Sequence, residues 1–235
     1  GYPRLRDTLP LCVELERGGA DMIEIGVPFS DPVADGPTIQ ASSEQALGNG
    51  MTVAALFAQL TALRAHVSLP VLLMGYLNPI LQFGIERFCD ECARVGVDGL
   101  IVPDLPLDEY RASLQGIFDA RSLSNCCLVT PETSPERMRL VDNTSSGFVY
   151  AVSVSSITGG RVSIDEARKA YFTRLRDFGF RNPVLVGFGI ADRTGFLQAC
   201  EYAQGAIVGS ALLRAIGEAD DPIAAAGAFV RDLRA

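Results

Sequence analysis

The chain has 235 residues, 48% of them hydrophobic, which is enough to bury a large core in one domain or in two small ones. Its formal net charge of −8 argues against nucleic acid and anionic membranes as partners, although backbone dipoles of an acidic protein still bind small phosphates. No apolar run has the length of a membrane-spanning helix and no signal-peptide pattern opens the chain, so we expect a cytoplasmic protein.

Short β-rich runs alternate with longer helical patterns along the chain. The sequence predicts helices at 4–17, 51–66, 82–95, 108–121, 134–142, 163–179, 192–203 and 222–234. It predicts strands between them, at 21–26, 69–75, 97–102, 126–130, 148–152, 184–187 and 205–208. Runs such as 69–75 are apolar on both faces, as in a parallel sheet covered by helices. This order predicts a parallel α/β fold with right-handed crossovers.

The predicted elements leave one strand-helix unit incomplete. The chain opens with a turn and a helix, and a strand in front of that helix would complete the eight units of a (β/α)8 or TIM barrel. We therefore expect a single barrel domain over residues 1–235 that lacks its N-terminal helix and first strand. An open doubly wound sheet is the alternative, but the sequence has no GxGxxG fingerprint for a dinucleotide.

Rare residue types limit the chemistry that is open to the chain. His66, the single histidine, falls in a predicted helix, which does not suit a Ser-His-Asp triad. Lys169, the single lysine, falls in the polar helix 163–179, which does not suit a Schiff-base aldolase. Cys89 and Cys92 form a CxxC on a predicted helix with no second pair at zinc spacing, so we expect no metal site. Carboxylates and backbone groups must therefore carry most of the chemistry.

One glutamate stands inside an apolar strand, in the stretch "DMIEIG" (21–26). Period-two alternation puts Glu24 on the opposite face from Ile23 and Ile25. We expect the two isoleucines to face the helices and Glu24 to lie buried in the barrel mouth, with its pKa raised toward neutrality. The alternative is a structural glutamate that is paired with an arginine.

The loop that follows, "GVPFSDPVADGPTIQ" (26–40), is polar and rich in proline. Its prolines restrict the backbone, and Gly36 permits a tight turn, which suits a lid with defined shapes. Asp31 and Asp35 stand in this loop. Asp-Pro and Asp-Gly are also common in ordinary turns, so the dipeptides alone do not establish a site.

Three late segments, "SITGGR" (156–161), "GFGI" (187–190) and "VGSALL" (208–213), each follow a predicted strand and consist largely of small residues. The loops after the last two strands of a TIM barrel, with the start of a short helix, commonly bind phosphate. Glycine lets the backbone approach the anion, and Ser210 suits the N-cap of such a helix. These segments predict a phosphate site.

The whole chain resembles the tryptophan synthase alpha subunit family, most clearly in "MIEIGVPFSDPVADGPTIQ" (22–40), "LLMGYLNPI" (72–80), "GVDGLIVPDLP" (96–106), "GFGI" and "VGSALL". The resemblance implies a lyase that cleaves indole-3-glycerol phosphate into indole and glyceraldehyde 3-phosphate, in the last steps of L-tryptophan biosynthesis. It implies no metal and no cofactor. It also implies a β subunit as partner in an α2β2 complex, with Asn78 and its neighbouring prolines at the surface that meets it.

Site residues also follow from the resemblance. It implies that Glu24 and Asp35 are catalytic and that Asp31 and Thr158 take part in loop closure. The residues that it assigns to substrate binding are Tyr150, Thr158, Gly159, Phe188, Gly189, Gly209 and Ser210. Two alternatives remain open: a non-catalytic regulatory partner of the β subunit, or another phosphate-binding TIM-barrel enzyme.

Overall fold

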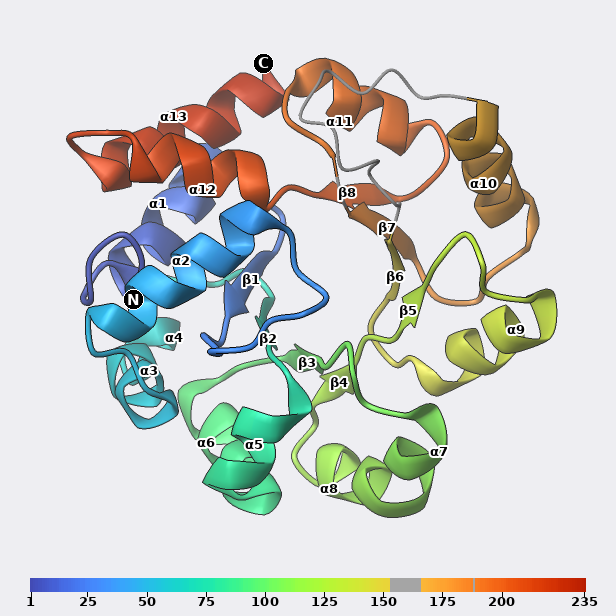
Figure 1. Cartoon of the computed structure of the whole chain (residues 1–235), viewed down its shortest axis with the longest axis horizontal. Helices are drawn as coiled ribbons and strands as arrows, with labels where there is room; N and C mark the ends of the chain where they lie inside the picture. The colour runs from blue at the N-terminus through green and yellow to red at the C-terminus, as the bar shows by residue number, and fades with distance from the viewer. Residues whose placement is uncertain (153–165, 188) are drawn as a thin grey trace. The chain divides into compact units, whose positions relative to one another are not determined.

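The computed structural model describes residues 1–152, 166–187 and 189–235. These residues divide into two compact units, one of Gly1–Ser124 with Leu212–Ala235 and the other of Asn125–Ala211. The described strands form two four-stranded sheets with the orders β1-β2-β3-β4 and β5-β6-β7-β8 (Figure 1). The expectations of a single domain and of a strand before Gly1 stay predictions.

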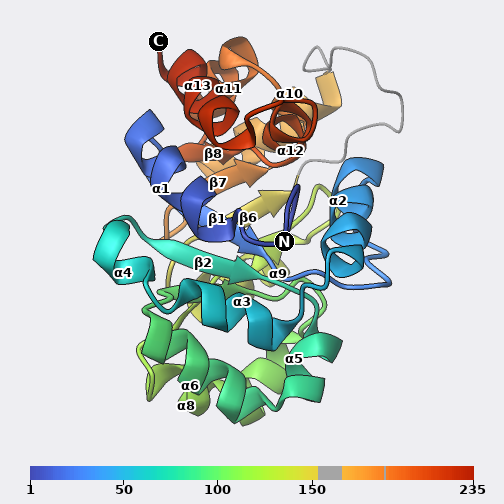
Figure 2. The ribbon, with the colours of Figure 1, turned by 90° about the vertical axis from the view of Figure 1, so that its left-hand side faces the viewer.

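The first sheet consists of β1 (Ile23–Gly26), β2 (Val71–Met74), β3 (Gly99–Ile101) and β4 (Ser124–Asn125), and β1, β2 and β3 pair in parallel. The helices of this unit are α1 (Thr8–Gly18), α2 (Pro37–Gly48), α3 (Val53–Leu60), α4 (Leu63–His66), α5 (Leu77–Phe83), α6 (Ile85–Val95), α7 (Leu107–Glu109), the π-helical turn η1 (Tyr110–Leu114), α8 (Gln115–Asp119) and α13 (Pro222–Arg234). The last of them, α13, packs along α1 (Figures 1 and 2).

The core of this unit lies between the sheet and its helices. Ile23 and Ile25 of β1 belong to one buried apolar cluster with Leu56 and Phe57 of α3. The alternation of β1 is therefore as predicted, because both isoleucines face the helices and Glu24 and Gly26 lie on the other face. Burying a side chain of this size contributes about 1.5–3 kcal/mol, so the cluster fixes which face of β1 carries Glu24.

The second sheet consists of β5 (Leu128–Val129), β6 (Val149–Val152), β7 (Val184–Gly187) and β8 (Gly205–Ile207), all parallel. The helices of this unit are α9 (Pro135–Thr144), α10 (Glu166–Asp177) and α11 (Arg193–Cys200). Two of them have side-chain N-caps: Ser134 accepts from the N–H of Arg137, and Asp192 accepts from the N–H of Gly195. The helix α12 (Ser210–Gly217) begins in this unit and ends in the other.

The predicted strand at 126–130 is wrong in its bounds, because the chain forms β4 and β5 on either side of a break. Serine hydroxyls take the backbone N–H groups there: Asn125 N donates to Ser146 Oγ (3.0 Å) and Cys127 N donates to Ser145 Oγ (3.2 Å). A side chain that satisfies a backbone donor in this way competes with the sheet ladder. The break therefore has a local cause that hydrophobic patterning does not reveal.

Two helices of the first unit, α2 and α5, were not predicted. In α2 only Ser42 and Ala46 are buried, so its sequence has no apolar stripe at helical spacing. Its start is nevertheless marked, because Gly36 is the N-cap and Pro37 occupies the first helical position. The sequence of α5 contains an Asn-Pro pair at 78–79, which is typical of turns and therefore does not predict a helix.

No single helix in the described part of the chain is both long and apolar enough to cross a membrane. The neighbouring segments Pro37–Gly48 and Val53–His66 pass that test of length and composition only when taken together, and they are bent by 86° relative to each other.

Asp142 is a buried charge on α9 that bonds to the segment before β7, and its loss should destabilise the fold. Its carboxylate is 1% exposed and accepts hydrogen bonds from the N–H groups of Arg181 and Asn182 and from the Asn182 amide. Burial alone raises the pKa of Asp142, but these donors outweigh it and lower the pKa below its ordinary value. We expect Asp142→Asn to lower the free energy of unfolding by about 2–4 kcal/mol, because the new NH2 group faces the same donors.

Urea unfolding at several pH values measures this effect. The contribution of Asp142 is complete above pH 3.8, the ordinary pKa of an aspartate, and disappears as the pH falls through the lower folded pKa. Asp177→Asn is the control, because the ion pair of Asp177 with Arg176 lies at the surface and its loss should change stability little. Equal stability of Asp142→Asn and the wild type at pH 7 would contradict this role.

Candidate active site

Glu24 lies in the middle of β1, on the face that points away from the helices of its unit. Its register partner on β2 is Leu72, an apolar and buried neighbour on the same face. The prediction that Glu24 is itself buried is wrong as regards surface area, because the residue is exposed. Its β-strand geometry explains this, since the face opposite the helices carries Met22 and Gly26, which are also exposed.

The pKa of Glu24 is nevertheless raised, from 4.5 to about 7. The larger cause is desolvation and the smaller is the negative charge of Asp35. Desolvation depends on the protein atoms packed around the carboxyl group and not only on the area of the residue that solvent reaches. At neutral pH Glu24 is therefore divided between its acid and its carboxylate, which suits a group that both gives and takes a proton.

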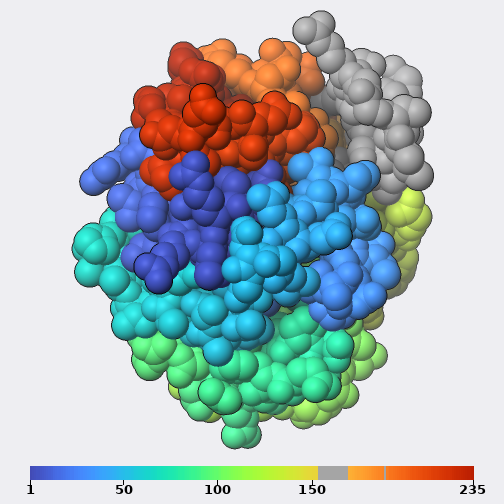
Figure 3. Space-filling model, turned by 60° about the vertical axis from the view of Figure 1, so that its left-hand side comes forward, coloured from blue at the N-terminus to red at the C-terminus, as the bar shows by residue number. Residues whose placement is uncertain are grey.

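Asp35 stands near the end of the loop between β1 and α2, and it is half-buried. Burial raises its pKa, and a hydrogen bond from the Tyr76 hydroxyl opposes that rise. The loop is tied at this end to α2, because Gln40 Nε2 donates to the backbone oxygen of Asp35 (2.9 Å). The space-filling view shows α2 and the loop before it at the surface of this unit, in blue (Figure 3). The two predicted catalytic carboxylates thus belong to one unit, and they are coupled.

Asp31 and Asn78, the other predicted residues of this unit, both lie at the surface. Asp31 is exposed in the same loop and accepts from Ser30 Oγ (2.5 Å). Asn78 is exposed in the first turn of α5. The prediction that Cys89 and Cys92 lie on a helix is confirmed, since both are buried on α6.

In the second unit, Tyr150 is buried on β6 and packs against β7. A Cβ atom built on Gly187 would lie 2.3 Å from the Tyr150 hydroxyl, so the glycine makes room for the ring. Gly187 was not predicted as a site residue. Its signal in the sequence is its place at the end of a strand that is otherwise apolar, where a missing side chain indicates close approach of another group.

The glycines of the predicted phosphate site follow two neighbouring strands. Gly187 and Ile207 are register partners at the ends of β7 and β8, and Gly189 and Gly209 each lie two residues further on. Gly189 has a φ of +75°, which favours glycine, and no atom lies within 4 Å of the place of its missing Cβ. The helix α12 begins at Ser210, so the residue predicted as its N-cap is instead its first helical residue. Backbone N–H groups in glycine-rich turns and at the start of a helix are the donors with which proteins bind small anions.

Three predicted residues, Thr158, Gly159 and Phe188, lie outside the described residues. Among the residues that are described, no group of three or more His, Cys, Asp or Glu side chains is arranged to hold a metal ion.

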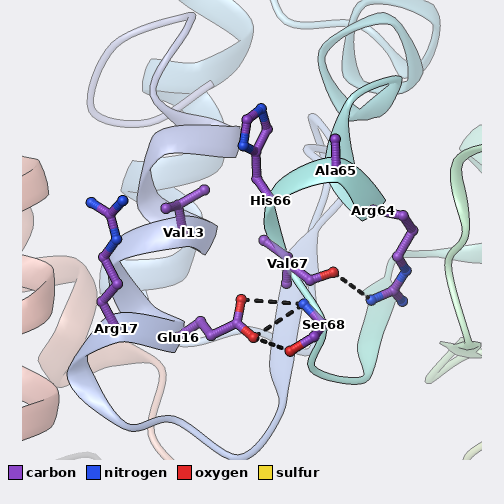
Figure 4. A pocket seen from close by; sticks show the side chains of 8 residues that line it. All are labelled: Val13, Glu16, Arg17, Arg64, Ala65, His66, Val67 and Ser68. Carbon is purple, nitrogen blue, oxygen red and sulfur yellow. Dashed lines mark hydrogen bonds between the residues drawn. The ribbon is translucent and has the colours of Figure 1, made fainter.

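A hollow of about 470 Å³ in the first unit does not involve these residues. It is lined by α1, α4 and the residues that precede β2 (Figure 4). Three of its polar residues bond to one another or to the backbone: Glu16 accepts from Ser68 N (3.1 Å) and from the Ser68 hydroxyl, and Arg64 donates to the oxygen of Val67. The hollow lies on the side where β2 begins, whereas ligands of parallel α/β proteins bind where the strands end.

Acidic side chains and glycine-rich turns at the carboxyl ends of parallel strands define a class of α/β enzymes whose sites lie at that edge. Within this class, the family model described as tryptophan synthase alpha chain matches residues 1–231. The chain belongs to the tryptophan synthase alpha chain family.

Individual relatives agree with the family match. The tryptophan synthase alpha chain of Flavobacterium johnsoniae is 51% identical over 218 residues, which are 93% of this chain and 86% of that protein. That of Christiangramia forsetii is 50% identical over 235 residues, which are 100% of this chain and 91% of that protein.

Solved structures show the same likeness. The alpha subunit from Legionella pneumophila superposes with a TM-score of 0.88 at 35% identity, over 100% of this chain and 88% of that one. A tryptophan synthase structure from Mycobacterium tuberculosis gives 0.88 at 35% identity, over 99% and 87%. The solved relatives are TIM barrels, and the predicted fold class is confirmed.

Membership of the family establishes the activity. The chain is a lyase of tryptophan biosynthesis that cleaves indole-3-glycerol phosphate. The family also implies a complex with the tryptophan synthase β subunit. The two alternatives, a non-catalytic partner of the β subunit and another phosphate-binding TIM-barrel enzyme, are therefore set aside.

Proposed function

We propose that Glu24 and Asp35 are the residues that carry the cleavage of indole-3-glycerol phosphate. The observation that supports this most is the pKa of Glu24, which desolvation and, to a smaller extent, the charge of Asp35 raise to about 7. Glu24 in its acid form gives a proton to indole C3, which makes the ring an indolenine with positive charge at nitrogen. Asp35, as an anion, accepts the N–H hydrogen bond and stabilises that charge.

The second half of the reaction uses the carboxylate that Glu24 has become. It takes the proton of the hydroxyl on the adjacent glycerol carbon. The O–H electrons form the aldehyde C=O, the bond from this carbon to C3 breaks, and its electron pair returns to the ring. The products are indole and glyceraldehyde 3-phosphate, and Glu24 ends protonated, as it began. The cycle uses no metal and no cofactor.

The other predicted residues bind and enclose the substrate. Gly189, Gly209 and Ser210 bind the phosphate through backbone N–H groups and the serine hydroxyl. Tyr150 lines the indole pocket. The remaining contacts come from Thr158, Gly159 and Phe188, with Thr158 and Asp31 in loop closure.

The complex with the β subunit has α2β2 stoichiometry in this proposal, and Asn78 lies at the shared surface. The enzyme works in the cytoplasm, where amino-acid biosynthesis takes place. Mass measurement of the complex reconstituted with a β subunit checks the stoichiometry. A 1:1 heterodimer would contradict it.

The pH dependence of kcat/KM for indole release tests the proton roles. Because Glu24 must be protonated to start the reaction and its pKa is about 7, activity should fall as the pH rises above 7. Because Asp35 must be ionised, activity should also fall toward acidic pH. Indole and glyceraldehyde 3-phosphate should appear in equal amounts. A rate that stays constant between pH 6 and 9 would contradict the role of Glu24.

A further inference from the structure

Tyr76 is the first residue after the Gly75 turn that ends β2, and its place there is fixed by its neighbours. The side chain is buried, and its backbone leads directly into α5. The next N–H, that of Leu77, donates to Asp104 Oδ1 (2.8 Å), and Gly75 N donates to the oxygen of Ile101 (3.1 Å). Both bonds tie this turn to β3 and to the loop after it. The tyrosine therefore projects from a rigid part of the first unit.

The Tyr76 hydroxyl contacts two consecutive residues of the loop that carries Asp35. It accepts a hydrogen bond from the N–H of Ala34 (3.0 Å) and donates one to Asp35 Oδ2 (3.0 Å). Its ring also packs on Phe29, near the beginning of the same loop, with centroids 5.4 Å apart. One side chain thus contacts the loop near both of its ends and bonds directly to the carboxylate.

The direction of the bond to Asp35 follows from the charges around it. Burial, the Asp35 charge and the carboxylate of Asp104 raise the pKa of Tyr76 to about 12, although the Ala34 N–H opposes the rise. The hydroxyl therefore keeps its proton at neutral pH and donates it to Asp35. The negative charge of Asp35 in turn helps to raise the pKa of Glu24 on β1. A donor to the ionised form favours that form, whereas burial and a second carboxylate oppose it.

We propose that Tyr76 is a positioning residue for the cleavage reaction, holding the Asp35 carboxylate as an oriented anion that faces the indole N–H. The inference rests on the role proposed above for Asp35. Tyr76 itself does not touch the reacting atoms in this proposal. It acts by fixing one carboxylate oxygen, which leaves the other free for the substrate, and by fixing the loop backbone at Ala34.

Tyr76→Phe keeps the ring and its packing on Phe29, and it removes only the hydroxyl. We expect kcat to fall about tenfold with little change in KM, as for the loss of one hydrogen bond to a charged group. The acidic limb of the kcat/KM profile should move to higher pH by up to about one unit, because the ionised form of Asp35 loses its donor. A purely structural role would not move that limb.

Two control variants separate the carboxylate from the loop. Gln40→Ala removes the other anchor of the loop, the bonds from Nε2 to the backbone oxygens of Asp35 and Pro32, and leaves the carboxylate bond in place. It should leave the acidic limb where it is. Tyr2→Phe makes the same chemical change at another place, since Tyr2 donates to the oxygen of Leu213 (3.2 Å). It should leave the whole profile unchanged.

The double variant Asp35→Asn/Tyr76→Phe completes the test. If Tyr76 acts through Asp35, the double variant should be no slower than Asp35→Asn alone. If Asp35→Asn is inactive while Tyr76→Phe has the kcat and pH profile of the wild type, the inference about Tyr76 is wrong and the proposed role of Asp35 stands. The inference is also wrong if the two losses in kcat multiply, so that the double variant is slower than Asp35→Asn alone. Wild-type activity of Asp35→Asn would instead overturn the proposed role of Asp35, and the inference with it.

Discussion

Glu24→Gln should lower kcat for indole release by about 10²–10⁴-fold, the usual contribution of a positioned acid–base group. Glutamine has nearly the same shape as glutamate but neither gives nor takes a proton, so both proton transfers at C3 and at the glycerol hydroxyl are lost. Substrate binding should change much less than kcat, because the phosphate contacts belong to other residues. Indole release with saturating substrate, measured by absorbance or by extraction, gives the effect directly.

The same substitution should not weaken the fold. The native protein binds more protons than the unfolded chain between pH 4.5 and 7, because the folded pKa of Glu24 is raised to about 7. Stability due to this group therefore falls as the pH rises through that window. Glutamine carries no such charge, so at pH 8 the variant should unfold at a higher urea concentration than the wild type.

Glu44→Gln, on the exposed face of α2, is the matched control and should change neither rate nor stability. A Glu24→Gln protein that is both inactive and less stable would mean that the loss of activity reflects misfolding. One that is fully active would remove Glu24 from the mechanism.

Asp35→Asn should lower kcat by about 10²–10³-fold, the cost of removing one preorganised group that stabilises charge in the transition state. The positive charge at the indole nitrogen appears only after C3 is protonated, so kcat should fall more than KM rises. Asp108→Asn, at an exposed position of α7, is the control for the loss of one surface charge.

A second effect of Asp35→Asn comes from the coupling between the two carboxylates. The charge of Asp35 helps to raise the pKa of Glu24, so its removal should lower that pKa. The basic limb of the remaining activity should therefore move to lower pH. A basic limb that stays in place would mean that the two groups are independent in solution, whatever the rate of the variant.

The sequence was sufficient to predict β1 and the face of it that carries Glu24, because the alternation of one strand depends on neighbours in the chain. Ile23 and Ile25 had to be buried together, and this left Glu24 on the opposite face. The exposure of Glu24 could not be predicted in the same way. How much of its surface remains open depends on what lies beyond that face, and hydrophobic patterning carries no information about it.

Tyr76 shows why part of the site escaped prediction. It stands 41 positions after Asp35 and meets it only because the loop after β1 returns over the end of β2. The motif that contains it, residues 72–80, carries the family resemblance and an expected role for Asn78, but it does not indicate a contact between Tyr76 and Asp35. Gly187 was not predicted for a related reason, because it leaves space for the ring of Tyr150 on the neighbouring strand. Contacts of this kind depend on register between distant segments, which one sequence does not specify.

Direct titration of the Glu24 carboxyl tests the central claim most closely. Carbon-13 NMR of protein labelled at the glutamate side-chain carboxyl, with Glu24→Gln used to assign the resonance, gives its midpoint without any assay of activity. The raised pKa predicts a midpoint near pH 7 in the protein without substrate. A midpoint near 4.5, the ordinary value for glutamate, would contradict the claim that the fold prepares this group to give a proton at neutral pH.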